Sequence, residues 1–348
     1  MKKSVAAALI LAAGLRIATL TGLGDKLETW LGSDSDSRLP FSAALSLEVG
    51  DSDFSGSVSA VTASSHEAAV PAVSSYSPAV TPTPYVPSEE IPEPVEKPTV
   101  LTAKFTSSLK IDNDTNFDID AAALLNEPLE LTLPSEGPQI LIIHTHGSEA
   151  YTQDSADRYV ETDPTRTDDT NYNVVRVGDV LEASLENFGL NVIHDRDLYD
   201  YPSYTGSYSR SGAAVESYLE QYPDIAIVID LHRDALGSGD VIYKTIASIE
   251  GTRSSQVMLL IGTGENGLAH PYWKENLKLA LRMQDAMDSK YPTLARPVDI
   301  VSERYNQHLT TGSMILEVGS NGNTLQEAIC AVRLFADAVG PMLSDLVQ

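Results

Sequence analysis

The segment Ile140-Leu-Ile-Ile-His-Thr-His-Gly-Ser-Glu149 decides the fold class and points to the chemistry of this chain. Its first four residues form a short, continuous run of branched apolar side chains, which is typical of a strand buried on both faces of a sheet. His144, His146 and Glu149 follow, so we expect them at the carboxyl end of this strand, the edge where sites form in open α/β sheets. An imidazole and a carboxylate three residues apart can hold one zinc ion when a third ligand comes from elsewhere.

Two further apolar runs end in polar residues of the same kind. Ile225-Ala-Ile-Val-Ile-Asp230 precedes His232 and Arg233, and Met314-Ile-Leu-Glu317 ends on a glutamate. If the three runs are parallel strands, these side chains meet at one edge of the sheet. A zinc peptidase or amidase uses two histidines and one glutamate as metal ligands and a further carboxylate as the general base.

Helical patterns alternate with these strands. Apolar residues recur at helical spacing over 174–188, a long helix is expected over about 272–290, and another over 325–339. The last of these opens with Thr324-x-x-Glu327, the pattern of a capping box. Alternating strands and helices predict an α/β fold with a mostly parallel sheet flanked by helices.

Composition excludes several classes of function. The chain has 348 residues, with 49 acidic and 23 basic side chains and a formal net charge of −26. Because phosphate binding needs a basic face, we expect no nucleic acid partner. Cys330 is the single cysteine, so the chain can form neither an intrachain disulfide nor a cysteine-based zinc site.

The N-terminal segment indicates export. Lys2 and Lys3 precede a largely apolar stretch from Ser4 to Leu23, and about 20 apolar residues are enough to cross a bilayer. Arg16 interrupts the stretch, which leaves two alternatives, an uncleaved anchor or a signal peptide that is removed. We expect residues 1–24 to form a membrane anchor with the catalytic domain outside the cytoplasm; the alternative is secretion after cleavage.

The composition changes after the anchor. Ser, Ala, Val, Thr, Pro and acidic residues dominate from about Ser33 to Thr99, and such a segment buries too little apolar surface to fold. We therefore expect residues 25–135 to be a largely disordered spacer with a short transitional element. The alternating pattern begins at Glu136, so residues 136–348 are predicted to be the catalytic domain.

Six motifs spread in order over this predicted domain resemble the stage II sporulation protein P family. They are His144-Thr-His-Gly-Ser-Glu-Ala-Tyr151, Asp195-Arg-Asp-Leu-Tyr-Asp-Tyr-Pro-Ser-Tyr204, Asp230-Leu-His-Arg-Asp-Ala235, Glu275-Asn-Leu-Lys-Leu-Ala280, Arg304-Tyr-Asn-Gln307 and Glu317-Val-Gly-Ser-Asn-Gly-Asn-Thr324. The resemblance implies a peptidoglycan hydrolase acting in engulfment during sporulation, an N-acetylmuramoyl-L-alanine amidase with additional endopeptidase activity. It also implies the fold of zinc-dependent muramoyl amidases and zinc carboxypeptidases, and the stage II sporulation proteins D and M as partners.

The resemblance also implies roles for individual residues. His146, Glu149 and His232 fall on the zinc ligands of the carboxypeptidase pattern, and Glu317 falls on the catalytic glutamate. One departure is that Thr145 stands where muramoyl amidases usually carry the first glycine of Gly-His-Gly. The choice between the two histidines that flank it therefore stays open.

Other positions are candidates for contacts with substrate. Arg233 could stabilise the oxyanion or hold a stem-peptide carboxylate, or form a structural salt bridge. His144 is expected behind the ligands or at the substrate rim. Asn276, Arg304 and Asn306 could orient substrate or cap loops.

Two alternatives differ in class from an amidase. A zinc carboxypeptidase that trims stem peptides would use the same metal ligands and a dedicated arginine for the free C-terminus. A non-catalytic scaffold that binds the cell wall would keep the fold and need none of the ligands. The joint presence of the candidate ligands speaks against the scaffold.

Overall fold

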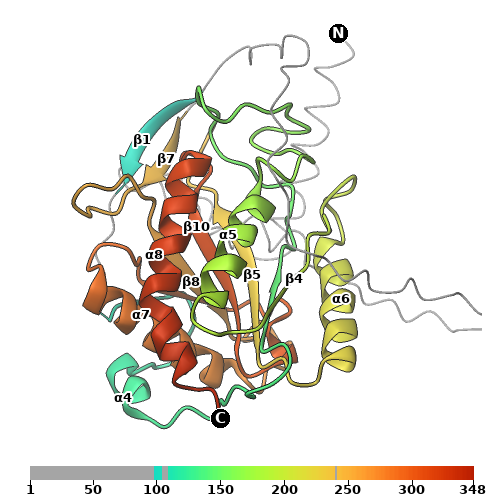
Figure 1. Ribbon diagram of the computed structural model, residues 1–348, viewed down its shortest axis with the longest axis vertical. Coiled ribbons are helices and arrows are strands. Elements are labelled where there is room, and N and C mark those ends of the chain that lie inside the picture. The colour runs from blue at the N-terminus through green and yellow to red at the C-terminus, as the bar shows by residue number, and fades with distance from the viewer. Residues whose placement is uncertain (1–97, 104–108, 240) are drawn as a thin grey trace, which may run out of the picture. The chain divides into compact units, whose positions relative to one another are not determined.

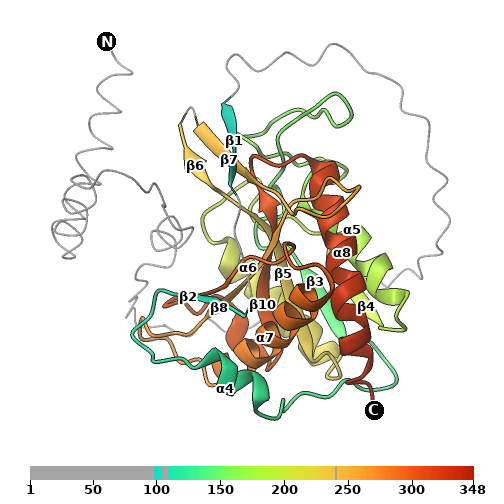
Figure 2. The same cartoon turned by 90° about the vertical axis from the view of Figure 1, so that its left-hand side faces the viewer.

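The computed structural model describes residues 98–103, 109–239 and 241–348. Their strands form one sheet of seven strands and one of three (Figures 1 and 2). The larger sheet has the order β2-β9-β8-β10-β5-β3-β4. In that order the strands span Ile111–Asn113, Val298–Val301, Val257–Gly262, Ser313–Ser320, Ile227–Asp234, Ile140–Ile143 and Val192–His194.

The direction of the strands makes the larger sheet mixed. Among its described strands, β8 and β10 form the one antiparallel pair, and all other neighbouring pairs are parallel. The α/β class with a sheet flanked by helices is therefore confirmed, although three strands run opposite to the other four. The carboxyl ends of β3, β5 and β10 lie at one edge, because these three strands are parallel neighbours.

Helices lie on both faces of this sheet (Figure 2). The main core lies on one face and receives residues from α5 (Val174–Glu186), α7 (Trp273–Lys290) and α8 (Leu325–Ser344), and helix α6 (Ser207–Gln221) packs on the other face. On β5, Ile227, Ile229 and Leu231 belong to the main core. Val228 points the other way and packs in a smaller cluster with Val215 of α6, as the alternation of side chains along a strand requires.

The helix boundaries follow from local side-chain chemistry. The capping box of α8 is confirmed: Glu327 N donates to Thr324 Oγ1 at 3.3 Å, and Thr324 N donates to the Glu327 carboxylate at 3.2 Å. Asn173 caps α5 by accepting a hydrogen bond from Val175 N at 3.0 Å. Each cap satisfies a backbone N–H that has no partner within its helix.

Several short elements were not predicted from the sequence. They are β1 (Thr99–Ala103), β2, α4 (Ala121–Asn126) and β9. In the smaller sheet, β1 pairs with β7 (Val241–Thr245), which also pairs with β6 (Gly237–Ser238). In the larger sheet, β2 is an edge strand paired with β9. Strands β1 and β2 and helix α4 lie ahead of Glu136, within the stretch where a short transitional element was expected. Strands this short carry too few residues to show a period.

Residues 1–97 lie outside the described residues, and with them the anchor or signal expected over residues 1–24 and most of the spacer. Over the part of the chain that the structure describes, no helix combines the length and apolar character that crossing a membrane requires.

The capping box gives a test of the fold. Thr324→Ala removes the side-chain acceptor for Glu327 N and should lower the free energy of unfolding by about 1 kcal/mol. Urea denaturation followed by circular dichroism measures this change. Thr324→Ser keeps the hydroxyl and should retain most of the stability, so equal losses in the two variants would contradict the role assigned to the cap.

Candidate metal centre

Three strands bring the predicted site residues together at one edge of the sheet. His146 and Glu149 lie in the loop after β3, His232 lies near the end of β5, and Glu317 lies in β10. The register pairs Glu317 directly with His232. The expectation that these residues converge is met, because β3, β5 and β10 are adjacent and parallel.

His146, Glu149 and His232 form a compact buried cluster. One ligand atom from each lies within 4.8 Å of the others, and all three residues are 0 % exposed. Glu149 Oε2 is 3.3 Å from His232 Nδ1, and Glu149 Oε1 is 3.8 Å from His146 Nδ1. Two ligands of a tetrahedral zinc ion with bonds of about 2.0–2.2 Å lie roughly 3.3–3.6 Å apart, so the spacing suits one such ion.

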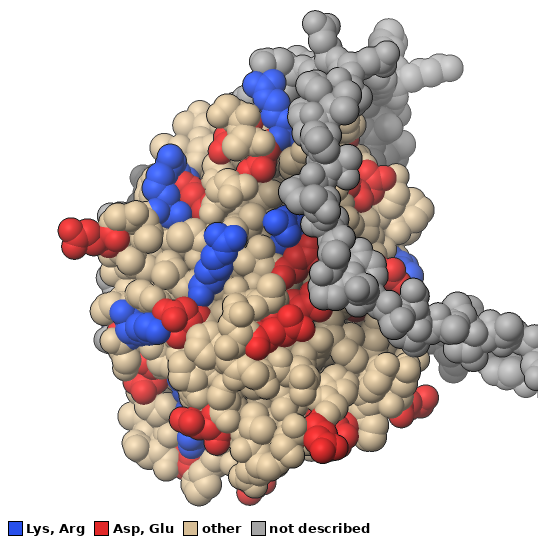
Figure 3. Space-filling model, in the orientation of Figure 1, with Lys and Arg blue, Asp and Glu red and all other residues tan. Residues whose placement is uncertain are grey.

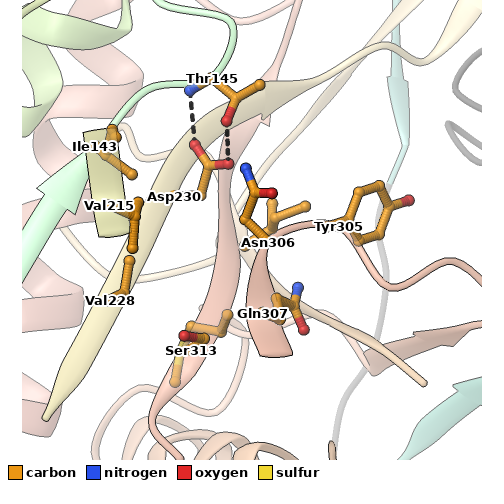
Figure 4. Close-up of a pocket in the computed structure, with 11 residues that line it drawn as sticks. Ile143, Thr145, Val215, Val228, Asp230, Tyr305, Asn306, Gln307 and Ser313 are labelled. Atoms are coloured by element: carbon orange, nitrogen blue, oxygen red, sulfur yellow. Dashed lines mark hydrogen bonds between the residues drawn. The ribbon is translucent and has the colours of Figure 1, made fainter. Parts of the chain in front are cut away.

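A carboxylate behind His232 fixes the orientation of its ring. Asp230 Oδ1 is 2.9 Å from His232 Nε2, which leaves Nδ1 directed towards Glu149. Asp230 is itself held by Thr145, whose backbone N and Oγ1 donate to it at 2.8 and 2.6 Å (Figure 4). A ligating histidine usually has a carboxylate or carbonyl at its second nitrogen, and here the sequence pattern Asp-Leu-His supplies it.

The charges around His232 make its ring strongly basic. Burial by itself would lower the pKa of His232, but the carboxylates of Asp230 and Glu149 raise it well above its usual value. A protonated ring cannot ligate a metal, so metal binding at this position displaces a proton.

Glu149 is held as a carboxylate by two arginines. Arg166 Nη2 donates to Glu149 Oε1 at 3.2 Å, and the backbone N of Arg233 donates to Oε2 at 3.2 Å. Burial would raise the pKa of Glu149, but Arg233, His232 and Arg166 hold it well below the usual range. The pair of arginines thus keeps a fully buried ligand ionised.

Glu317 stands apart from this network. It is 1 % exposed, and neither of its carboxylate oxygens has a hydrogen-bond partner among the described residues. Burial, reinforced by Asp234, raises the pKa of Glu317 well above its usual value, while His232 opposes the shift. An unsatisfied buried carboxyl group is costly, and a cation bound beside it would lower its pKa and offset that cost.

The two histidines of the first motif lie in different surroundings. His144 Nδ1 donates to the carbonyl of Leu231 at 2.9 Å, and its Nε2 lies 2.7 Å from Nε2 of His194. Burial, with His194 adding to it, lowers the pKa of His144 to about 3. His144 therefore bridges Leu231 of β5 and His194, whereas His146 belongs to the candidate metal cluster.

Arg233, for which the sequence left open a contact with substrate or a structural salt bridge, is engaged by groups of the protein. Side chains alternate along a strand, so Arg233 and His232 leave β5 on opposite faces. The guanidinium is buried and donates to the carbonyls of Ala150 at 2.9 Å and Thr165 at 3.2 Å. Its contact with the cluster is through Glu149, whose Oε1 is 3.9 Å from Nη1. Arg233 thus positions a ligand and the loop beside it.

The three remaining candidates lie in or beside the turn that precedes β10. Asn276 is buried and joins this turn to the strand, donating to Gln307 O and accepting from Ser313 N. Asn306 donates to Ser211 Oγ at 3.1 Å and lines a small pocket below Asp230 (Figure 4). Arg304 donates to a backbone carbonyl at 3.3 Å near the surface. Their contacts assign the two asparagines to holding the turn.

A tyrosine-rich segment, Tyr199 to Tyr208, lies against the cluster. The ring of Tyr204 stacks on His146 with centroids 4.6 Å apart, and Tyr208 meets it edge-on at 5.4 Å. Arg166 lies 5.0 Å from the Tyr204 ring centroid and also pairs with Asp200 at 2.5 Å. The loop therefore forms one wall of the site.

Sequence reasoning did not single out Arg166 or Asp200. Arg166 lies in an irregular loop where no period marks it. Asp200 lies in the motif Asp195 to Tyr204, which carried the family resemblance without a role for this residue, although its density of carboxylates was a signal.

The cluster predicts a measurable metal content. His232→Ala removes one of three ligands, so the full chain should lose one equivalent of zinc, measured by elemental analysis after dialysis. His308→Ala, in the 3-10 turn Gln307–Leu309, is the matched control and should keep the metal. A His232→Ala protein with the metal content of the wild type would contradict the assignment.

The comparisons with known proteins agree with these motifs. The family model described as stage II sporulation protein P (SpoIIP) matches residues 77–340. The stage II sporulation protein P of Bacillus subtilis (strain 168) is 29 % identical over 217 residues, covering 59 % of this chain and 51 % of that protein. The chain thus spans about half the length of this curated relative.

Solved structures of muramoyl amidases are also similar to the chain. AmiC2 of Nostoc punctiforme has a TM-score of 0.33 at 11 % identity, over 60 % of this chain and 96 % of that one. Ami1 of Mycobacterium smegmatis has a TM-score of 0.35 at 14 % identity, over 60 % and 96 %. The CwlD amidase of Clostridioides difficile, solved in complex with the GerS lipoprotein, has a TM-score of 0.38 at 11 % identity, over 60 % and 98 %. Since the family model covers most of its length, the chain belongs to the stage II sporulation protein P family.

Proposed function

We propose that this chain is a zinc-dependent peptidoglycan hydrolase that cleaves the N-acetylmuramoyl-L-alanine amide bond during engulfment in sporulation. Membership of the stage II sporulation protein P family supports the biological setting. The observation that carries the chemistry is the buried cluster of His146, Glu149 and His232, with Glu317 beside it.

The donor set fits zinc. Two imidazoles and one carboxylate are a usual set of protein ligands for catalytic zinc, which keeps a further position open. The carboxylate of Glu317 has no hydrogen-bond partner among the described residues and lies opposite the candidate ligand His232 in the strand register. A cation there would compensate its burial. When bound there, zinc would polarise the scissile carbonyl and lower the pKa of a water molecule to about 7.

The protein's own groups divide the remaining tasks. Glu317 takes a proton from the attacking water and passes it to the leaving amine, which requires a carboxylate that no other residue engages. Asp230 orients His232 through the contact at Nε2. Arg166 and Arg233 keep Glu149 ionised and in place. Asp230 and Arg233 are buried and Arg166 is half-buried, so contacts within the protein order the site before substrate arrives.

The arginines favour an amidase over a carboxypeptidase. A carboxypeptidase needs a guanidinium available for the free C-terminus of the substrate. Of the two arginines at the described cluster, Arg233 is committed to carbonyls and Arg166 to the carboxylates of Glu149 and Asp200. Neither guanidinium is left for a terminal carboxylate. A non-catalytic scaffold is disfavoured because it has no use for a buried carboxyl group without a partner.

Mass spectrometry of digested peptidoglycan distinguishes these activities. An amidase releases intact stem peptides from the glycan, whereas a carboxypeptidase leaves shortened peptides attached to it. An additional endopeptidase would cut the cross-links between peptides. Products made only of shortened, glycan-linked peptides would reject the amidase proposal.

The role of Glu317 gives a sharp test. Glu317→Gln keeps the size of the side chain but cannot accept the proton, so hydrolysis should fall by about 10²–10⁴-fold. The metal content should remain that of the wild type. Muropeptide release and elemental analysis measure the two quantities, with the exposed Glu250→Gln as control. Near-normal turnover would move the base elsewhere, and loss of metal would make Glu317 a ligand.

The proposal extends to location and partners. Lys2, Lys3 and the apolar stretch to Leu23 support a membrane anchor, with the catalytic part outside the cytoplasm and the spacer reaching the wall. The family supports the stage II sporulation proteins D and M as partners, and peptidoglycan as substrate.

Fractionation tests the anchor. The full chain should sediment with membranes, and truncation after Gly24 should move it to the soluble fraction, because the truncation removes the apolar stretch. Recovery of the full chain in the soluble fraction, with an N-terminus between about residues 17 and 35, would instead support a cleaved signal peptide.

A further inference from the structure

A second group of potential metal ligands, separate from the first cluster, lies at the edge of the larger sheet that ends in β4. Asp179 and Glu182 are one turn apart on α5, and His194 ends the edge strand β4. One ligand atom from each lies within 4.8 Å of the others. On the face seen in Figure 3, basic and acidic side chains lie side by side around this helix.

The distances around His194 are those of ligands around an ion. Its side chain is 0 % exposed, and Nδ1 lies 3.4 Å from Asp179 Oδ1 and 3.6 Å from Glu182 Oε2. Both separations exceed the usual hydrogen-bond range of about 2.7–3.2 Å. They match the roughly 3.3–3.6 Å between two ligands of a tetrahedral zinc ion. Consistently, Nδ1 has no hydrogen-bond partner among the described residues.

The hydrogen bond between the edge-on rings of His144 and His194 fixes which nitrogen of His194 faces the carboxylates. The carbonyl of Leu231 can only accept, so His144 carries its hydrogen on Nδ1. His144 Nε2 is then an acceptor, and His194 Nε2 must donate to it across 2.7 Å. The other ring nitrogen of His194, Nδ1, therefore faces the two carboxylates. It is in position to bind a cation together with them.

The packing around the two imidazoles confirms that their positions are constrained. A Cβ atom at Gly178 would lie 2.5 Å from His194 Nε2 and 2.7 Å from His144 Nε2. No side chain fits at this position on α5 unless the histidine pair moves. The helix therefore lies as close to the rings as its backbone allows, which brings Asp179 to His194.

Arg196 holds the two carboxylates from the solvent side. Its Nε donates to Asp179 Oδ1 at 2.8 Å and its Nη2 donates to Glu182 Oε2 at 2.6 Å. Carboxylates that ligate a metal are commonly hydrogen-bonded in this way. The guanidinium is 49 % exposed, so it lies outside the group, whereas His194 approaches from the buried side. The repulsion between Arg196 and an ion should weaken binding without closing the site.

We propose that Asp179, Glu182 and His194 bind a second divalent metal ion of the zinc class, which fastens α5 to β4. One imidazole with two carboxylates suits zinc, cobalt or manganese better than magnesium or calcium. The hydrogen-bonded path from His194 through His144 to Leu231 O reaches the residue before His232. The ion thereby stabilises the backbone that carries a ligand of the first cluster, and it does not take part in hydrolysis.

Metal stoichiometry in matched variants of the full chain tests the proposal. The wild type should bind two equivalents of zinc, Asp179→Asn/Glu182→Gln one, His146→Ala one, and the triple variant none. Glu186→Gln, on the same helix one turn further, is the control and should bind two. The double variant should keep hydrolytic activity. A wild type and a double variant with equal zinc content would overturn the second site.

The same series separates this proposal from the proposed function. If only the first cluster failed to bind metal, the wild type would hold one equivalent that His146→Ala retains and the double variant loses. If only the second site failed, the wild type would hold one equivalent that His146→Ala loses and the double variant retains.

Arg196→Gln provides a second measurement that does not depend on the fold of the double variant. In the His146→Ala background, removal of the nearby positive charge should tighten zinc binding by about tenfold, measured by competition with a chelating dye. A mere salt-bridge cluster would bind no zinc with or without Arg196. Absence of zinc binding in both proteins would therefore overturn the proposal.

Discussion

The compensation of buried charge at one edge of a mixed sheet is the constraint on which the rest of this structure depends. Glu149, Asp230 and His232 are brought there by the ends of β3 and β5, in places where water cannot solvate them. Buried charges are tolerated only when paired and hydrogen-bonded. The loops that carry Arg166 and Arg233 supply that pairing, so the path of the chain around the site follows from electrostatics as much as from apolar packing.

The same requirement explains why Glu317 differs from its neighbours. The other carboxylates at this edge have donors, including Arg296, which pairs with Asp234 at 2.5 Å. Glu317 has none among the described residues, although it is paired in register with His232. A group left unpaired within an otherwise compensated set is the one that remains available to exchange a proton with substrate.

The fold and most of the centre could be predicted because their signals are local. The runs before His144, Asp230 and Glu317 identified three strands, and each polar residue follows its run directly. The prediction failed where the signal was weak or remote. Strands β2 and β9, of three and four residues, are too short to show a period. The antiparallel pairing of β8 with β10 depends on how the segment between β9 and β10 reverses the chain, which no local pattern encodes.

Sequence by itself thus determined the α/β class, the capping box of α8, and the set from which ligands are drawn, because hydrophobic period and residue chemistry are properties of neighbouring residues. Only the tertiary structure placed His146 and not His144 beside Glu149 and His232, directed Arg233 towards Glu149, and brought Arg166 and Asp200 to the same cluster. It also brought Asp179 of helix α5 next to His194 of strand β4. These choices depend on which face of a strand a side chain leaves and on which loops meet, and both are fixed only when the sheet is assembled.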